Sequence, residues 1–244
     1  MSVDYRVEGS GPPLLYVCGI EGTGSLFYKQ SADLARDHTV VSFALRAEGR
    51  YALTQLVEDL AWVLRDVGRG RATVLGESFG GLLTMAAALE HPDLFDRMIL
   101  VNTFPHFAER LRIHAGCALF PLAYPLIKAY RRRAARHALF GEDVSEEDRR
   151  EFQERTRVVP RDGYLSRLRI IRDTDLRPRL KEIDTPALVV AGVEDRFLDS
   201  VTAAKLMASG LPRARLKLLE GTGHVALLSE RVRVRDWLTE FEGL

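Results

Sequence analysis

The segment Gly76-Glu77-Ser78-Phe79-Gly80-Gly81 is the most informative part of this chain. It follows the apolar run 72–75, which predicts a buried strand, and it precedes residues 82–89, which predict a helix. A serine hydroxyl is a weak nucleophile and has to be presented where a base and a carbonyl group can both reach it. A tight strand-to-helix turn with small neighbouring residues presents it in this way. Ser78 is therefore a candidate nucleophile, with a helix N-cap as the plainer alternative.

Short apolar runs alternate with helical patterns on both sides of this segment. The runs are continuously apolar, which favours parallel strands that are covered on both faces. Between them, apolar residues recur at helical spacing. This alternation predicts an α/β fold with a doubly wound, mostly parallel sheet. The predicted strands are 14–18, 39–44, 72–75, 98–101, 187–191 and 216–219, and the predicted helices are 56–67, 82–89, 201–209 and 232–241.

The alternation is interrupted in residues 104–183, which are helical in composition and rich in arginine. This segment holds 18 Lys and Arg against 12 Asp and Glu, whereas the rest of the chain has a net charge of −5. We expect a sheet-based core of residues 1–103 and 184–244 with a helical insertion of residues 104–183. Because open α/β sheets bind ligands at the carboxyl ends of their strands, where the insertion begins, we expect a lid over a site. A helical elaboration that only covers the sheet is the alternative.

The composition is typical of a globular protein. The 244 residues are 46% hydrophobic and 28% charged, which argues against disorder. A net charge of +1 argues against general nucleic-acid binding. Two cysteines and the lack of a signal-peptide pattern at the N-terminus favour a cytoplasmic location. The longest run without Asp, Glu, Lys or Arg, 113–127, is shorter than the roughly 20 residues that span a bilayer.

In this setting the segment 76–81 resembles the nucleophile elbow of the α/β-hydrolase family, serine hydrolases that carry a helical cap. The resemblance implies an acid and a histidine that follow the serine along the chain. Asp195, in Ala191-Gly192-Val193-Glu194-Asp195 after a predicted strand, looks like the family's acid. His224, in Gly221-Thr222-Gly223-His224 after the last predicted strand, looks like its histidine.

The implied catalytic residues are thus Ser78, Asp195 and His224. In such a triad His224 takes the proton of Ser78, while Asp195 fixes the tautomer of the imidazole and stabilises the imidazolium. Glu194 and Asp199 are alternatives for the acid. His224 could instead be a plain loop histidine.

The family's oxyanion hole uses two backbone N–H groups, each worth about 3 kcal/mol to the transition state. By position these are the N–H of Phe79, after the nucleophile, and that of Ile20, in the loop after an early strand. Many relatives have His-Gly at the start of this loop, where the present chain has Cys18-Gly19. The departure weakens the match without breaking it, because the donor is a backbone group. We interpret Cys18 as a small apolar filler, with a nucleophilic role as the alternative.

The same loop, Gly19-Ile20-Glu21-Gly22-Thr23-Gly24, is similar to a narrower branch. This is the phytyl ester synthase-like group of esterases, lipases and thioesterases, which has Gly-x-Asp-Gly-Thr-Gly here. Glu21 replaces that aspartate, while Asp33-Leu34-Ala35, Val40-Val41 and the elbow are also similar to the branch. The likeness implies a fatty-acyl substrate and allows transfer of the acyl group to an alcohol in place of water.

Residues 115–127 of the insertion are almost wholly apolar, and basic residues follow directly in 128–136. This stretch could form a core helix of the lid, a wall for an acyl chain, or an apolar wedge that docks on an anionic membrane surface. The candidate residues of the substrate pocket are Glu21, Phe104, His106, Leu119, Phe120 and Tyr124.

We therefore expect a serine-dependent hydrolase that cleaves a carboxylic ester or thioester through an acyl-enzyme. The expected partner is a small acyl ester or thioester and not a nucleic acid; the patterns do not indicate an oligomeric state. Because no metal-ligand cluster or phosphate loop is visible, we expect no metal and no organic cofactor. The same scaffold also serves acyl transfer, perhydrolysis, carbon–carbon bond hydrolysis and small-molecule reception with little turnover, and these alternatives stay open.

Overall fold

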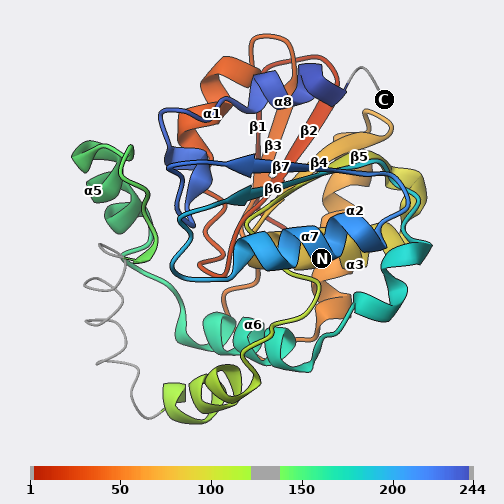
Figure 1. Ribbon diagram of the computed structural model, residues 1–244. Helices are drawn as coiled ribbons and strands as arrows, with labels where there is room; N and C mark the ends of the chain where they lie inside the picture. Colours follow the sequence, from red (N-terminus) through yellow and green to blue (C-terminus); the bar gives the residue numbers. More distant parts are fainter. Residues whose placement is uncertain (1–2, 122–137, 242–244) are drawn as a thin grey trace.

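The computed structural model of the chain describes residues 3–121 and 138–241 (Figure 1). These residues form a seven-stranded sheet with the strand order β1-β3-β2-β4-β5-β6-β7. β1 pairs antiparallel with β3, and the other neighbouring strands are parallel. The strands are β1 (Tyr5–Glu8), β2 (Pro13–Val17), β3 (Thr39–Phe43), β4 (Ala72–Glu77), β5 (Phe95–Val101), β6 (Ala187–Gly192) and β7 (Ala214–Leu219).

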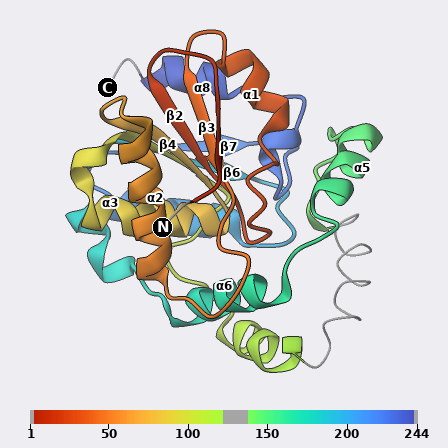
Figure 2. The ribbon, with the colours of Figure 1, turned by 180° about the vertical axis from the view of Figure 1, so that it is seen from behind.

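Helices cover both faces of the sheet, as Figures 1 and 2 show. On one face lie α1 (Tyr28–Leu34) and α8 (Val234–Phe241), and on the other lie α2 (Leu53–Val67), α3 (Phe79–Glu90) and α7 (Ser200–Gly210). This arrangement confirms the predicted doubly wound α/β fold with a mostly parallel sheet. Short 3-10 helices are η1 (Pro92–Leu94), η2 (Arg177–Glu182) and η3 (Ala226–Leu228).

The hydrophobic core explains why the strands are continuously apolar. Every residue of β2 and β6 is buried, because helices cover both faces of these inner strands. β7 differs, because it lies at one edge of the sheet, where Leu216 and Leu218 are each 39% exposed. The prediction of a strand at 216–219 is correct, but this strand is only partly buried, unlike the strands covered on both faces that the sequence predicts.

Among the described strands and α-helices outside the insert, two have no counterpart in the sequence predictions. β1 is short and mostly exposed at the opposite edge of the sheet, so it lacks a buried apolar run. α1 has seven residues, of which Gln30 and Leu34 are buried, too few for an apolar stripe at helical spacing.

Residues 104–183, hereafter the insert, lie between β5 and β6 in the chain. Its described helical parts are residues 110–121, α5 (Glu146–Arg155), α6 (Arg161–Asp173) and η2. Residues 110–121 lie beside α6 in both views, and the ring of Phe120 stacks on that of Tyr164 at 5.0 Å. Among the helices of the described residues, none has the length and apolar character that crossing a membrane requires.

Candidate active site

Ser78 occupies the sharp turn between β4 and α3. Its backbone has φ 54° and ψ −121°, a region that costs a non-glycine residue conformational energy and often marks a functional site. The turn packs closely against β2, because a Cβ atom at Gly80 would lie 2.1 Å from the carbonyl oxygen of Val17. A Cβ atom at Gly76 would lie 2.5 Å from the Thr84 hydroxyl. Glycine is therefore required at positions 76 and 80 by the close packing of the turn against β2 and the first turns of α3.

A chain of hydrogen bonds joins Ser78 to His224 and Asp195. His224 Nε2 lies 3.1 Å from Ser78 Oγ, and His224 Nδ1 lies 2.7 Å from Asp195 Oδ2. The side chains of His224 and Asp195 are almost fully buried. The three residues come from the loops that follow β4, β7 and β6, at the carboxyl ends of these parallel strands.

Asp195 is held in place by four hydrogen bonds. Its Oδ1 accepts the N–H groups of Phe197 at 2.8 Å and Leu198 at 3.0 Å, and its Oδ2 accepts the Ser200 hydroxyl at 2.5 Å besides the imidazole of His224. Burial raises the pKa of Asp195, but the charge of His224 and these hydrogen bonds outweigh burial and lower it overall. Burial lowers the pKa of His224, and the charge and hydrogen bond of Asp195 more than reverse this, so the pKa is raised.

The two alternative acids take other places. Glu194 is exposed, and Asp199 caps the N-terminus of α7, where its carboxylate accepts the N–H of Thr202 at 3.1 Å. Of the three neighbouring carboxylates, the structure brings Asp195 to the imidazole of His224.

The predicted oxyanion loop, residues 19–24, begins beside the nucleophile. A Cβ atom at Gly19 would lie 3.5 Å from the Cβ of Ser78. Phe79 is fully buried as the first residue of α3, where the helix dipole favours negative charge. Within the described residues, neither the N–H of Ile20 nor that of Phe79 has a hydrogen-bond acceptor. In the described part of the chain both groups therefore lack a protein acceptor, as a role in an oxyanion hole requires.

Cys18, at the end of β2, is fully buried, and its Sγ approaches the carbonyl oxygen of Phe43 at 3.9 Å. Burial raises the pKa of this thiol to about 11. A protonated, enclosed thiol is a poor nucleophile, which agrees with the interpretation of Cys18 as an apolar filler.

Glu77 places a second carboxyl group close to the imidazole. Its Oε2 accepts the hydroxyl of Tyr16 at 2.8 Å, and in the described part of the chain its buried Oε1 has no partner. Burial raises the pKa of Glu77 to about 7, and its negative charge raises the pKa of His224. The residue before the nucleophile therefore titrates near neutral pH, a property that the quoted motif alone did not indicate.

Asn102, directly after β5, is a residue that the sequence analysis missed. It is fully buried with φ 45°, and its Nδ2 donates to the carbonyl oxygens of Gly223 at 2.9 Å and His224 at 2.7 Å. Its Oδ1 accepts the N–H of Gly192 at 2.7 Å. Asn102 thereby joins the ends of β5 and β6 to the histidine loop. The available signal was a polar residue immediately after the apolar run 98–101.

The insert contacts the loops that carry the acid and the histidine. Arg112 donates to the carbonyl oxygen of Phe197 at 3.2 Å and lies over its ring at 5.0 Å, and that ring packs on His224 at 4.9 Å. In the histidine loop, the N–H of Val225 donates to the carbonyl oxygen of Leu139 at 2.9 Å. Insert and site loops are therefore joined directly.

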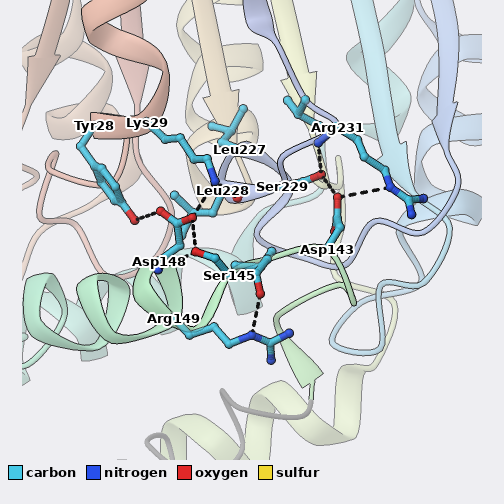
Figure 3. A network of polar contacts seen from close by, with 12 residues as sticks. Tyr28, Lys29, Asp143, Ser145, Asp148, Arg149, Leu227, Leu228, Ser229 and Arg231 are labelled. Atoms are coloured by element: carbon cyan, nitrogen blue, oxygen red, sulfur yellow. Dashed lines mark hydrogen bonds and ion pairs between the residues drawn. The ribbon is translucent and has the colours of Figure 1, made fainter.

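Polar contacts attach α5 and the segment before it to the core (Figure 3). Asp148 accepts the hydroxyl of Tyr28 at 2.9 Å and the ammonium group of Lys29 at 2.6 Å. Nearby, Asp143 accepts the hydroxyl of Ser229. A small apolar cluster joins the same parts of the chain, and its buried members are Leu26, Phe140, Val144, Phe152, Val225 and Leu228.

Two predicted pocket residues lie where the insert leaves the sheet. Phe104 is buried in the main core and packs edge-to-face on Phe107 at 5.5 Å. His106 forms an isolated antiparallel bridge with Asp175, at the other end of the insert. Burial lowers the pKa of His106, which keeps its imidazole neutral near pH 7.

The other predicted pocket residues are dispersed. The carboxylate of Glu21 would lie 3.6 Å from a Cβ atom at Gly19, close to the start of the oxyanion loop. In the helical residues 110–121, Phe120 is buried against α6, whereas Leu119 is 57% exposed. Tyr124 and the basic residues of 128–136 lie outside the described residues.

Fold and site together define a class of protein: an α/β protein with a serine, a histidine and an aspartate in hydrogen-bond contact at the carboxyl ends of its strands. In residues 3–121 and 138–241, no group of three or more His, Cys, Asp or Glu is arranged to hold a metal ion.

Comparison with known proteins identifies the family. The family profile described as alpha/beta hydrolase fold matches residues 12–230, so this chain belongs to the α/β-hydrolase fold family. A protein of Agrobacterium fabrum named "Putative carbamate hydrolase RutD" is 27% identical over 92% of this chain and 90% of its own length. An identically named protein of Pseudomonas savastanoi pv. phaseolicola is 26% identical over 97% of this chain and 96% of its own length.

Solved structures show the same fold. An esterase from Exiguobacterium antarcticum has a TM-score of 0.87 at 20% identity and covers 98% of this chain and 94% of its own. A protein of Mycobacterium tuberculosis H37Rv, titled "Putative non-heme bromoperoxidase BpoC", has a TM-score of 0.84 at 20% identity and covers 100% of this chain and 96% of its own. These likenesses confirm the predicted resemblance to the α/β hydrolases.

Proposed function

We propose that this α/β hydrolase cleaves a carboxylic ester or thioester through an acyl-enzyme, with Ser78, His224 and Asp195 as its catalytic triad. The observation that carries the proposal is the continuous path Ser78 Oγ–His224 Nε2, 3.1 Å, and His224 Nδ1–Asp195 Oδ2, 2.7 Å. Nucleophile and base lie within hydrogen-bond reach, and the base is oriented by a third group, as covalent catalysis requires.

In the acylation step, Ser78 Oγ attacks the carbonyl carbon and its proton passes to His224 Nε2. Asp195, kept ionised by its hydrogen bonds, stabilises the imidazolium that forms. The carbonyl oxygen becomes an oxyanion that the N–H groups of Ile20 and Phe79 stabilise. The tetrahedral intermediate then collapses: the bond to the leaving oxygen or sulfur breaks, and His224 returns the proton to the leaving alcohol or thiol.

In the second step, His224 takes a proton from water, and the hydroxide oxygen attacks the acyl carbon on Ser78. Collapse of this intermediate releases the carboxylic acid, and Ser78 Oγ recovers its proton from His224. An alcohol that replaces the water gives acyl transfer with the same groups, so the two reactions differ only in the acceptor.

We assign the insert, residues 104–183, the role of a lid on the core of residues 1–103 and 184–244. Its support is the direct contact of the insert with the loops of Phe197 and His224. We further assign apolar residues of the insert the role of lining the acyl site, so that acyl groups longer than acetyl are preferred.

A second candidate substrate is a carbamate. It rests on the relatives named "Putative carbamate hydrolase RutD", which match more than nine-tenths of this chain. A carbamate presents the same kind of carbonyl carbon to Ser78, and only the group on the acyl side changes.

The test is a turnover panel of nitrophenyl esters and acyl thioesters of increasing chain length, with aryl carbamates as a third series. We expect turnover of esters and thioesters with a preference beyond acetyl, and its loss in Ser78→Ala at an unchanged melting temperature. Faster turnover of carbamates would favour the second candidate. Undiminished turnover in Ser78→Ala would contradict both, and product analysis with added alcohol separates hydrolysis from transfer.

A further inference from the structure

The insert contributes a buried arginine to the neighbourhood of the site. Arg167 on α6 is 1% exposed and belongs to the buried side of that helix, together with Gly163, Ile170 and Ile171. Among the described residues, no carboxylate forms an ion pair with it. Burying a guanidinium group is costly unless its N–H groups are satisfied, so its hydrogen-bond partners determine what it does.

The partners of Arg167 are oxygens of the core. Its Nε donates to the carbonyl oxygen of Ile20 at 2.7 Å, and Nη2 donates to that of Glu21 at 3.4 Å. Nη1 donates to the carbonyl oxygen of Arg46 at 3.0 Å and to the hydroxyl of Tyr51 at 2.8 Å. Two of these four bonds therefore hold the consecutive carbonyl groups of Ile20 and Glu21 in the oxyanion loop.

The loop folds closely around the guanidinium group. Gly22 has φ +71°, and a Cβ atom there would lie 2.7 Å from Cζ of Arg167. The N–H of Gly22 donates to the carbonyl oxygen of Gly19 at 3.0 Å, which closes a tight turn over Ile20. The N–H of Ile20 and its carbonyl group flank the same Cα atom. Fixing the carbonyl within this turn therefore restricts the direction of the N–H.

The helix that carries Arg167 is itself anchored to the core. The N–H of Gly163 donates to the carbonyl oxygen of Ala47 at 2.9 Å, and the hydroxyl of Ser166 donates to that of Gly49 at 3.1 Å. The hydroxyl of Tyr51 reaches the carbonyl oxygen of Gly163 at 2.9 Å. The backbone that carries Arg167 is thus held in a fixed position relative to the oxyanion loop.

We propose that Arg167 is a positioning residue of the oxyanion hole, which holds the loop 19–24 so that the Ile20 N–H faces the reacting carbonyl oxygen. The inference rests on the proposed function, because it assigns a task within that chemistry. It also gives the insert a second role: besides covering the site, the insert completes it.

The experiment compares Arg167→Lys and Arg167→Met with Asp148→Asn. The control loosens a different attachment of the insert to the core, the ion pair of Asp148 with Lys29 in Figure 3, without touching the oxyanion loop. For each protein, kcat and KM for a nitrophenyl ester are measured, together with the affinity for a trifluoromethyl ketone and the melting temperature. The ketone forms a tetrahedral adduct with a serine and therefore reports on the oxyanion hole directly.

We expect kcat to fall by about 10- to 100-fold in both Arg167 variants, while KM changes little. This loss does not exceed the one that follows removal of a whole oxyanion donor. Affinity for the ketone falls by a similar factor, and Asp148→Asn keeps the wild-type kcat. Arg167→Lys retains a cation at the site, so it stays informative where the methionine variant does not fold.

Wild-type kcat in folded Arg167→Lys would overturn the inference, as would an equal loss of kcat in Asp148→Asn. A wild-type protein that neither turns over esters nor binds the ketone would overturn the proposed function, and the inference with it. The wild-type measurement thus separates the two failures.

Discussion

The side-chain amide of Asn102 donates a hydrogen bond of 2.7 Å to the backbone carbonyl oxygen of His224, the residue that we assign as the base. Since the same side chain also binds Gly192 at the end of β6, it fixes the histidine loop relative to the sheet. The position of the imidazole is therefore set from both sides, by Asp195 at Nδ1 and by Asn102 at the backbone.

Replacement of Asn102 separates this hydrogen bonding from backbone strain. Asn102→Gly tolerates the positive φ but removes the amide, whereas Asn102→Ala also strains the backbone. We expect both variants to lose about 1–3 kcal/mol of unfolding free energy, because buried carbonyl groups lose their donor. Ester turnover should fall in both. Loss of turnover in the alanine variant alone would show that strain, and not the amide, matters.

Replacement of Asp195 identifies the acid. Asp195→Asn should lower kcat by about 10⁴-fold, because the imidazole loses its tautomer control and the charge that stabilises its protonated form. Asp199→Asn is the matched control, since asparagine caps a helix as well as aspartate does. Steady-state kinetics of both variants decide the matter, and equal losses would refute the assignment.

The pH dependence of activity should report His224. The pKa of His224 is raised above the ordinary 6.5, and the imidazole must be neutral to act as the base. We therefore expect kcat/KM to rise with pH, and the midpoint of this rise to lie above pH 6.5. Glu77→Gln removes a negative charge that raises this pKa, so its midpoint should move to lower pH. Rate profiles of the two proteins test this, and an unchanged or higher midpoint in the variant would argue against coupling.

Stability should also depend on Glu77. Its pKa rises from 4.5 in the unfolded chain to about 7 in the fold, so the folded protein keeps a proton that the unfolded chain has lost. The resulting stabilisation is complete below pH 4.5 and is lost as the pH rises through 7, by up to about 3 kcal/mol. Urea unfolding at both ends of this range measures the free energy of unfolding. The stability of Glu77→Gln relative to the wild type should increase as the pH rises. A constant difference would contradict the shift.

Much of the fold and the core of the site follow from local sequence. The buried strands of the sheet are apolar runs. Ser78, Asp195 and His224 each lie in the loop or turn that directly follows a predicted strand. Parallel strands bring these loops to one edge of the sheet, so residues far apart in the chain meet in a predictable place.

The supporting residues depend on contacts that no local pattern contains. Arg167 lies 147 residues from Ile20, and in the sequence it is one of 18 basic residues of the insert. Its place on the apolar side of α6, beside Ile170 and Ile171, was the available signal. The exposure of Leu216 likewise follows from the edge position of β7, which depends on the order of the whole sheet.

The central claim, that Ser78 is the activated nucleophile, is tested most directly by intact-protein mass spectrometry after reaction with a fluorophosphonate. We predict a single adduct that peptide mapping places on Ser78, absent from Ser78→Ala and formed far more slowly in His224→Ala. An unlabelled Ser78, or labelling that persists at the wild-type rate in His224→Ala, would contradict the claim.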